Sequence, residues 1–304
     1  MLGASGAGTR PAQLVLGEVS EGAVEAPSEW VEETTVRVAL VQMNSRDDKA
    51  ANLERAEALV AQAATWGPDL VVLPELWTYL GPAKRHPDVA EAIPGETSDL
   101  LGRLASRYGC WLVGGSYLEA VEGSGRVCNT SVALSPDGEL VARYRKLHLF
   151  DVEVDGKTYH ESATTAPGDD AVLVDAGRVK VGLTICYDLR FPELYRRLAD
   201  RGARLVTVPA AFTMETGKDH WEPLLRARAI ENQVFVLAAA QCGPHPPVNV
   251  CYGNAMIVDP WGVVLARAGY REGVVVADLD LGQQERLRES LPALRHRRHD
   301  LFTF

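Results

Sequence analysis

The stretch that decides the fold is VKVGLTIC, residues 179–186, which runs directly into YDLRFPE, residues 187–193. Its first part is apolar, as in a buried strand, and Pro192 is a residue type that often opens a helix. Strand, sharp turn and helix in this order display the side chain at the turn, which is Cys186. Because a helix N-terminus favours the thiolate, we expect a nucleophile here; the alternative is an inert core cysteine.

Two further apolar runs end in charged residues. DLVVLPE, residues 69–75, ends in Glu75, and LVARYRK, residues 140–146, ends in Lys146. Taken singly, the first is typical of a solvated glutamate and the second of an exposed basic stripe. Together with Cys186 they form a covalent amidase set, with Glu75 as base for the thiol and Lys146 as cation for the developing oxyanion.

The composition is that of an ordinary globular protein. The chain has 304 residues, of which 46% are apolar and 24% charged, and its formal net charge is −10 at pH 7. We expect one domain over residues 36–304. Phosphate binding needs a basic surface, so an acidic chain predicts no nucleic-acid partner. No stretch approaches the roughly 20 apolar residues of a membrane span, so no membrane partner is expected.

The cysteines and the N-terminus indicate the compartment. Five cysteines, at positions 110, 128, 186, 242 and 251, lack paired close spacing, so we predict neither disulfides nor a metal site. Residues 1–35 are rich in Gly, Ala, Ser and Glu and lack the regions of a signal peptide, which predicts a flexible N-terminal extension. Reduced thiols without an export signal predict a cytoplasmic protein.

The predicted elements repeat in the two halves of the chain. Ser45 and Thr97 are the expected caps of the first two helices. The turns SPDG, residues 135–138, and DPWG, residues 259–262, each predict a hairpin. Between the helices we expect strands over residues 36–42, 69–74 and 111–117, and again over 179–185, 204–209 and 234–238.

Two such β-α-β-α-β units predict an α/β fold, a four-layer α-β-β-α sandwich with two pseudo-symmetric halves. In this arrangement Glu75 ends the second strand of one half, and Cys186 ends the first strand of the other. We therefore expect the two side chains to converge.

Three motifs resemble the nitrilase, or carbon–nitrogen hydrolase, superfamily. They are LPEL at residues 73–76, YRKLHLFD at 144–151 and ICYDLRFPE at 185–193. The resemblance implies the nitrilase fold, a Glu-Lys-Cys triad, no cofactor, a small-molecule amide substrate and a homodimer or higher homo-oligomer. It also implies a second carboxylate near the lysine, for which Glu161 is the matching residue.

The roles of the remaining candidates follow from this assignment. The backbone N–H of Tyr187 is expected to join Lys146 in holding the oxyanion. Arg190 either faces a substrate carboxylate or, as we favour, forms a structural ion pair with Glu193. His148 and His220 lack metal-ligand spacing and are expected to be structural.

The motifs leave two classes of substrate open. TGKDHWE (216–222), LRARAIE (225–231), AAAQCG (238–243) and HRRHDLF (296–302) resemble deaminated-glutathione amidases, whereas HLFDVEVDGK (148–157) looks equally like ω-amidases. We favour deaminated glutathione, with α-ketoglutaramate as the slower substrate. A biosynthetic amidase or acyl-transferring enzyme, a nitrile hydrolase and a non-catalytic assembly module are the alternatives.

Overall fold

The computed structural model describes residues 34–302 except 124, 155 and 248. The expected extension over residues 1–35 lies almost wholly outside the described residues. Its flexibility and the domain limits therefore stay predictions.

The first sheet contains the parallel strands β1, β2 and β3, which continue through the antiparallel strands β5 and β4. β17 adds to the other side of β1 and is antiparallel to it. β6 pairs with β5 across the predicted turn at residues 135–138, so that hairpin is confirmed. The strands are β1 (Thr35–Gln42), β2 (Leu70–Val72), β3 (Trp111–Val113), β4 (Tyr117–Ala120), β5 (Val127–Leu134), β6 (Leu140–Arg145) and β17 (Gly273–Asp280).

The second sheet repeats the same plan. Its parallel strands β10, β11 and β12 are followed by the antiparallel hairpin β15–β16 around the predicted turn at residues 259–262. β9 flanks β10 as β17 flanks β1. The strands are β9 (Leu173–Asp175), β10 (Lys180–Leu183), β11 (Leu205–Thr207), β12 (Phe235–Ala238), β15 (Met256–Val258) and β16 (Val264–Arg267).

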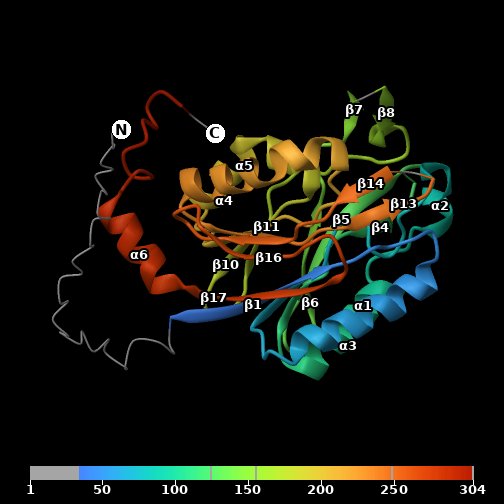
Figure 1. The fold of residues 1–304 in the computed structure, drawn as a ribbon, viewed down its shortest axis with the longest axis horizontal. Coiled ribbons are helices and arrows are strands. Elements are labelled where there is room, and N and C mark those ends of the chain that lie inside the picture. The colour runs from blue at the N-terminus through green and yellow to red at the C-terminus, as the bar shows by residue number, and fades with distance from the viewer. Residues whose placement is uncertain (1–33, 124, 155, 248, 303–304) are drawn as a thin grey trace, which may run out of the picture. The chain divides into compact units, whose positions relative to one another are not determined.

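Helices cover the outer faces of the two sheets (Figure 1). α1 and α3 lie on the first sheet and α4 and α5 on the second, while α6 follows β17. The longer helices are α1 (Lys49–Ala64), α3 (Glu96–Tyr108), α4 (Pro192–Asp200), α5 (Met214–Asn232) and α6 (Leu281–Ser290). The short ones are α2 (His86–Val89) and the 3₁₀ turns η1 (Ala83–Arg85), η2 (Glu161–Ala163) and η3 (Cys186–Arg190).

Alternation along β1 explains why the sheets stack. Val38 and Leu40 pack into a core shared with strands of the second sheet, while Ala39 and Val41 pack into a core shared with α1 and α3. Successive side chains of a strand point to opposite faces, so an apolar run of this kind is buried on both sides. The predicted four-layer α-β-β-α sandwich is confirmed.

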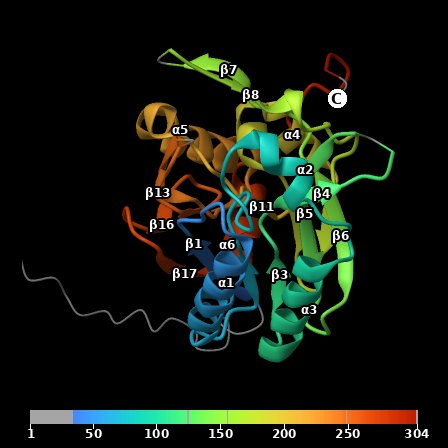
Figure 2. The same ribbon diagram turned by 90° about the vertical axis from the view of Figure 1, so that its right-hand side faces the viewer.

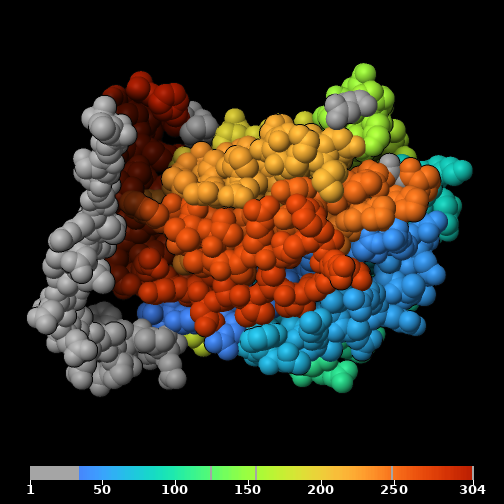
Figure 3. All heavy atoms as spheres, in the orientation of Figure 1, coloured from blue at the N-terminus to red at the C-terminus, as the bar shows by residue number. Residues whose placement is uncertain are grey.

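Two separate hairpins lie at the edge of the sandwich. β7 (Asp151–Val154) pairs with β8 (Lys157–His160), and β13 (Cys242–His245) pairs with β14 (Asn249–Tyr252). The β7–β8 hairpin projects beyond the neighbouring surface (Figures 2 and 3). Among the described residues, no helix is long and apolar enough to cross a membrane.

Both predicted helix caps were wrong. α1 is capped by Asp48, whose side chain accepts the N–H of Ala51, while Ser45 is buried and its hydroxyl accepts from Gln241. α3 starts after Gly95, and Thr97 lies inside its first turn. The Ser45 hydroxyl is taken up by a partner that the local pattern does not show, while the Thr97 hydroxyl has no hydrogen-bond partner among the described residues.

The single strand expected over residues 111–117 is also wrong, because Gly115 interrupts it. Its φ is +58°, in the left-handed region, and a Cβ there would lie 2.0 Å from the carbonyl oxygen of Pro74. Only glycine fits so close to another backbone. The chain turns at Gly115 and continues as β4, and this turn supports the segment that carries Glu75.

Candidate active site

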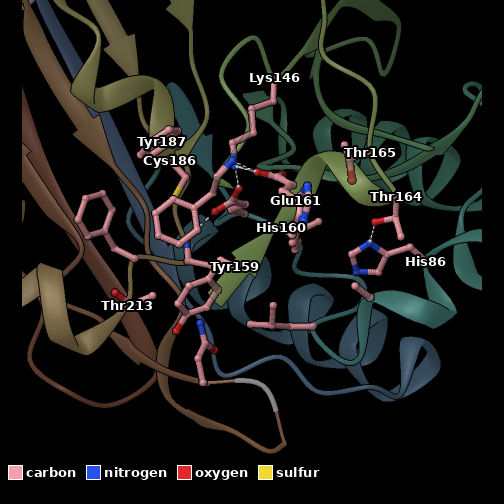
Figure 4. A pocket seen from close by; sticks show the side chains of 18 of the residues that line it. His86, Lys146, Tyr159, His160, Glu161, Thr164, Thr165, Cys186, Tyr187 and Thr213 are labelled. Atoms are coloured by element: carbon pink, nitrogen blue, oxygen red, sulfur yellow. Dashed lines mark hydrogen bonds and ion pairs between the residues drawn. The ribbon is translucent and has the colours of Figure 1, made fainter. Parts of the chain in front are cut away.

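A cavity of about 200 Å³ lies where the ends of β2, β6 and β10 meet. Figure 4 shows Lys146, Glu161 and Cys186 facing one another inside it. The wall on one side comes from η1, α2 and the residues after η2, and on the other from the start of α5 and from β14. Besides the charged residues, it is lined by Leu76, Leu80, His86, Leu118, Phe150, Tyr159, His160, Thr164, Thr165, Tyr187, Ala211, Phe212, Thr213, Thr216 and Asn249, among others.

Glu75 lies three residues after β2 and is only 3% exposed. Its Oε1 accepts hydrogen bonds from Lys146 Nζ and from Asn129 Nδ2, both at 2.9 Å. Its Oε2 accepts the backbone N–H of Ala211 at 2.8 Å. A buried carboxylate is stable as an anion only when it is bonded in this way. The three donors fix the position of the side chain.

Lys146 follows β6 directly and is 2% exposed. Its ammonium contacts Glu75 Oε1 at 2.9 Å and Glu161 Oε2 at 2.9 Å. Burial alone would lower the pKa of Lys146, but the adjacent charges of Glu161 and Glu75 outweigh it and hold that pKa well above the usual range. The lysine is therefore a permanent cation in the cavity.

Glu161 opens η2, directly after the projecting β7–β8 hairpin. Besides Lys146, its Oε2 accepts the backbone N–H of Phe150 at 2.7 Å. The structure thus brings together Glu75, Lys146 and Glu161, as the sequence predicts. Their catalytic roles stay predictions.

Cys186 follows β10 at the start of η3, and its φ is +45°. Such a conformation costs a non-glycine residue about 1–3 kcal/mol and needs a surrounding structure to hold it. The N–H of Cys186 donates to the carbonyl of Pro209 at 2.8 Å. The backbone thus places Cys186 at a sharp turn, as predicted.

The expected stabilisation of the thiolate is wrong in direction. Burial, followed by the charge of Glu75, raises the pKa of the Cys186 thiol well above its usual range, and Lys146 offsets this only in part. The first turn after Cys186 is a short 3₁₀ segment, and α4 begins only at Pro192. The resting form is the neutral thiol, which needs a base to react.

Asp188 anchors the turn around Cys186, and the sequence reasoning did not single it out. Its carboxylate is fully buried and accepts from Ile185 N at 2.8 Å, Tyr144 Oη at 2.7 Å and His148 N at 3.1 Å. His148 Nδ1 lies 2.7 Å from the same carboxylate, so His148 is structural, as predicted. One side chain ties the end of β10 to the segment that carries Lys146.

Tyr187 and Arg190 differ in their position relative to the cavity. Tyr187 lines it, with its ring edge against Phe150. Arg190 lies behind this wall: its guanidinium is over the rings of Tyr187 and Phe212 and 3.3 Å from Nδ1 of His220. The favoured ion pair with Glu193 is not found among the ion pairs of the described residues, because the aromatic wall and His220 take up the guanidinium instead.

Asn129 is a further polar residue of the site that sequence reasoning missed. It lies in β5, is 1% exposed, and donates to Glu75 and, at 3.3 Å, to Glu161. The available signal was an asparagine inside the largely apolar run VCNTSVAL, residues 127–134, which the structure shows to be a strand with all eight residues buried. Buried amides are rare and need partners.

The other cysteines are buried and free, as expected of core residues. Burial raises the pKa of Cys110 and of Cys242 to about 11, and that of Cys251 well above its usual range. None is poised to act as a thiolate. In the part of the chain that the structure describes, no cluster of three or more His, Cys, Asp or Glu residues could hold a metal ion.

Comparison with known proteins places this geometry in a family. The family model described as carbon-nitrogen hydrolase matches residues 37–289. Human omega-amidase NIT2 is 42% identical over 270 residues, which cover 88% of this chain and 97% of that protein. Deaminated glutathione amidase from a Synechocystis strain is 44% identical over 263 residues, covering 85% and 97%.

Solved structures agree with the sequence comparison. The NitFhit protein of C. elegans superposes with a TM-score of 0.83 at 39% identity, over 89% of this chain and 66% of that one. Nit3 of Saccharomyces cerevisiae, a member of branch 10 of the nitrilase superfamily, gives 0.80 at 35% identity, over 87% and 97%. The resemblance predicted from three motifs is therefore confirmed, and the chain belongs to the carbon-nitrogen hydrolase family.

Proposed function

We propose that this protein hydrolyses a small carboxylate-bearing amide through a thioester on Cys186. The observation that carries the proposal is the meeting of Glu75, Lys146 and Cys186, from three separate strand ends, in one cavity. A base, a fixed cation and a nucleophile in contact are the parts that acyl transfer needs.

Acylation begins from the neutral thiol. Glu75 accepts the proton of the Cys186 thiol as Sγ bonds to the carbonyl carbon of the amide. Lys146 Nζ and the backbone N–H of Tyr187 hold the oxygen of the tetrahedral intermediate, and each good donor contributes on the order of 10²–10³ in rate. When the C–N bond breaks, Glu75 returns the proton to the leaving nitrogen, which departs as ammonia or an amine.

In deacylation Glu75 again carries a proton, this time from water to the sulfur. A water molecule attacks the thioester carbonyl and gives its proton to Glu75. The C–S bond breaks, the sulfur recovers the proton from Glu75, and the carboxylic acid leaves. Glu161 keeps Lys146 in place through both steps, because it is the second acceptor of the ammonium.

Deaminated glutathione is the substrate we favour. The segments over residues 216–231 and 238–243 and the C-terminal residues 296–302 support it, and the Synechocystis relative carries that name. α-Ketoglutaramate, which shares the acyl part, is the second candidate, since the human relative is an omega-amidase. Arg190 stands behind Tyr187 and Phe212, so we expect it to favour a substrate carboxylate through its charge rather than by contact.

The test compares kcat/KM for the two compounds with one enzyme preparation. We expect deaminated glutathione to be preferred, with release of α-ketoglutarate and cysteinylglycine. A clear preference for α-ketoglutaramate would move the protein to the ω-amidases. No turnover of either, with product appearing only when an amine acceptor is added, would replace hydrolysis by acyl transfer.

The homodimer or higher homo-oligomer also stays our prediction. Light scattering should return a mass of at least twice the 33.0 kDa of one chain. A monomer at micromolar concentration would contradict it.

A further inference from the structure

Asn129 contacts every charged member of the catalytic cluster. Its Nδ2 lies 2.9 Å from Glu75 Oε1 and 3.3 Å from Glu161 Oε1, and its backbone carbonyl accepts the N–H of Lys146 at 2.9 Å. β5 holds it from behind, where it is paired with Leu118 of β4. Asn129 is not among the described residues that line the cavity, so substrate would not reach it.

The orientation of this amide is set by the carboxylates. Its Oδ1 is buried and has no hydrogen-bond partner among the described residues. Leaving a buried acceptor unpaired costs about 1–3 kcal/mol. The amide therefore gives up its acceptor in order to point both donor hydrogens at Glu75 and Glu161, which is the arrangement expected if those two bonds matter more.

The two carboxylate oxygens of Glu75 differ in how many hydrogen bonds they already accept. Oε1 already accepts from Lys146 and Asn129, which fill its two lone pairs, whereas Oε2 has a single donor among the described residues, the N–H of Ala211. A proton arriving from Cys186 therefore has a free site on Oε2 alone.

We infer that Asn129 is a positioning residue that fixes the Glu75 carboxylate and directs the incoming proton to Oε2. The inference rests on the proposed function, in which Glu75 is the base. Without the amide, Glu75 would lose a donor that favours its charged form, and Oε1 would compete for the proton.

Other titratable groups surround Glu75 and stay unchanged in the test. Lys146 stands at the end of β6, Glu161 in η2, Cys186 in η3 and Cys251 in β14. The cavity wall adds four more such groups, which are His86, Tyr159, His160 and Tyr187. Changing only residue 129 therefore isolates the amide.

The experiment measures kcat/KM and kcat against pH for N129L and N129D. N129L keeps the branched shape of the side chain and removes the donors, so we expect kcat to fall about 10- to 100-fold, with KM within about twofold. The midpoint of the acid limb should rise by about one pH unit. N129D adds a third carboxylate, so its midpoint should rise further. Ser131→Ala, which alters a buried polar residue of the same strand, should leave the midpoint where it is.

Circular dichroism over the same pH range checks that the folded fraction of each variant stays constant, and under that condition a merely structural role would not move the midpoint. If N129L yields no folded enzyme by circular dichroism, N129S is judged by the same measure. An unchanged midpoint in the folded variant overturns the inference while E75Q stays inactive. If E75Q itself keeps near-native rates, the proposed function fails, and the inference fails with it.

Discussion

The two halves of the sandwich use the same backbone for different purposes. In each half a proline follows the second parallel strand, Pro74 after β2 and Pro209 after β11. In the first half the next residue is Glu75, whereas in the second it is Ala210. The second segment contributes backbone groups instead: Pro209 accepts from Cys186, and Ala211 donates to Glu75. One half supplies the charged side chain, and the other supplies fixed dipoles and the proposed nucleophile, Cys186.

The β5–β6 hairpin of the first half and the β15–β16 hairpin of the second half differ in the same way. β6 leads to Lys146, which is buried between two carboxylates, while β16 ends in Arg267, whose side chain is 36% exposed and pairs with Glu222 of α5. η2 covers the lysine with Glu161, and α5 offers the arginine a partner at the surface. The terminal cation of the repeated element thus lies in the cavity only where another segment buries it.

The largest effect should come from removing Cys186, the side chain that the second half contributes to the cavity. Cys186→Ala deletes the nucleophile, so turnover should disappear in an assay of amine release. Alanine fits the small buried site, and the melting temperature should stay within a few degrees of wild type. Substantial residual turnover would remove Cys186 from its assigned role.

Next in size is the loss of the base of the first half. Glu75→Gln keeps the shape of the side chain but cannot accept the proton of a thiol whose pKa is raised. We expect kcat to fall at least about 10²-fold. Near-native turnover would require another base for Cys186.

The contrast between the hairpins is tested by a matched pair. Lys146→Met leaves Glu75 and Glu161 buried without a counter-charge, so we expect a loss of about 3–5 kcal/mol in the free energy of unfolding and at least about 10² in kcat. Arg267→Met also removes hydrogen bonds to Asn254 and Tyr252, so it should cost up to about 2 kcal/mol and leave kcat within about twofold. Urea unfolding of both variants measures this, and equal losses would contradict the contrast.

The smallest effect concerns a segment specific to the first half. Between β2 and α3 the chain adds η1 and α2, where burial lowers the pKa of His86 to about 4. The unfolded chain takes up this proton below about pH 6.5 and the folded one only near pH 4, so stability is lost as the pH falls between these values. His86→Asn should reduce this acid loss by about 1–2 kcal/mol between pH 7 and pH 4.5. An identical pH profile of unfolding would show that His86 titrates normally.

Residues at the ends of apolar runs could be predicted from sequence, because strand ends converge in a layered fold. Glu75, Lys146 and Cys186 were found in this way, and the repeat of turns predicted the two halves. Asn129 and Asp188 could not be found in this way, because most of their partners are distant in the sequence. The carboxylates that Asn129 contacts are 32 and 54 residues away. Asp188 has a local partner in Ile185, but its other partners are 40 and 44 residues away.

The direction in which the pKa of the Cys186 thiol is shifted could not be predicted from the sequence for a related reason. A local pattern shows the turn next to Cys186, but not that Glu75 arrives beside it from the other half. The position of Ser45 was missed likewise, because its partner Gln241 is 196 residues away.

The shared core between the sheets makes the halves suitable for fragment complementation. Val38 and Val72 of the first sheet and Val181 of the second belong to one apolar cluster, so neither half can bury its inner face alone. A break in the turn at Gly177, where a Cβ would meet nothing within 4 Å, would leave Glu75 and Lys146 on one fragment and Cys186 on the other. Amide hydrolysis would then report the association of whatever two proteins are fused to the fragments.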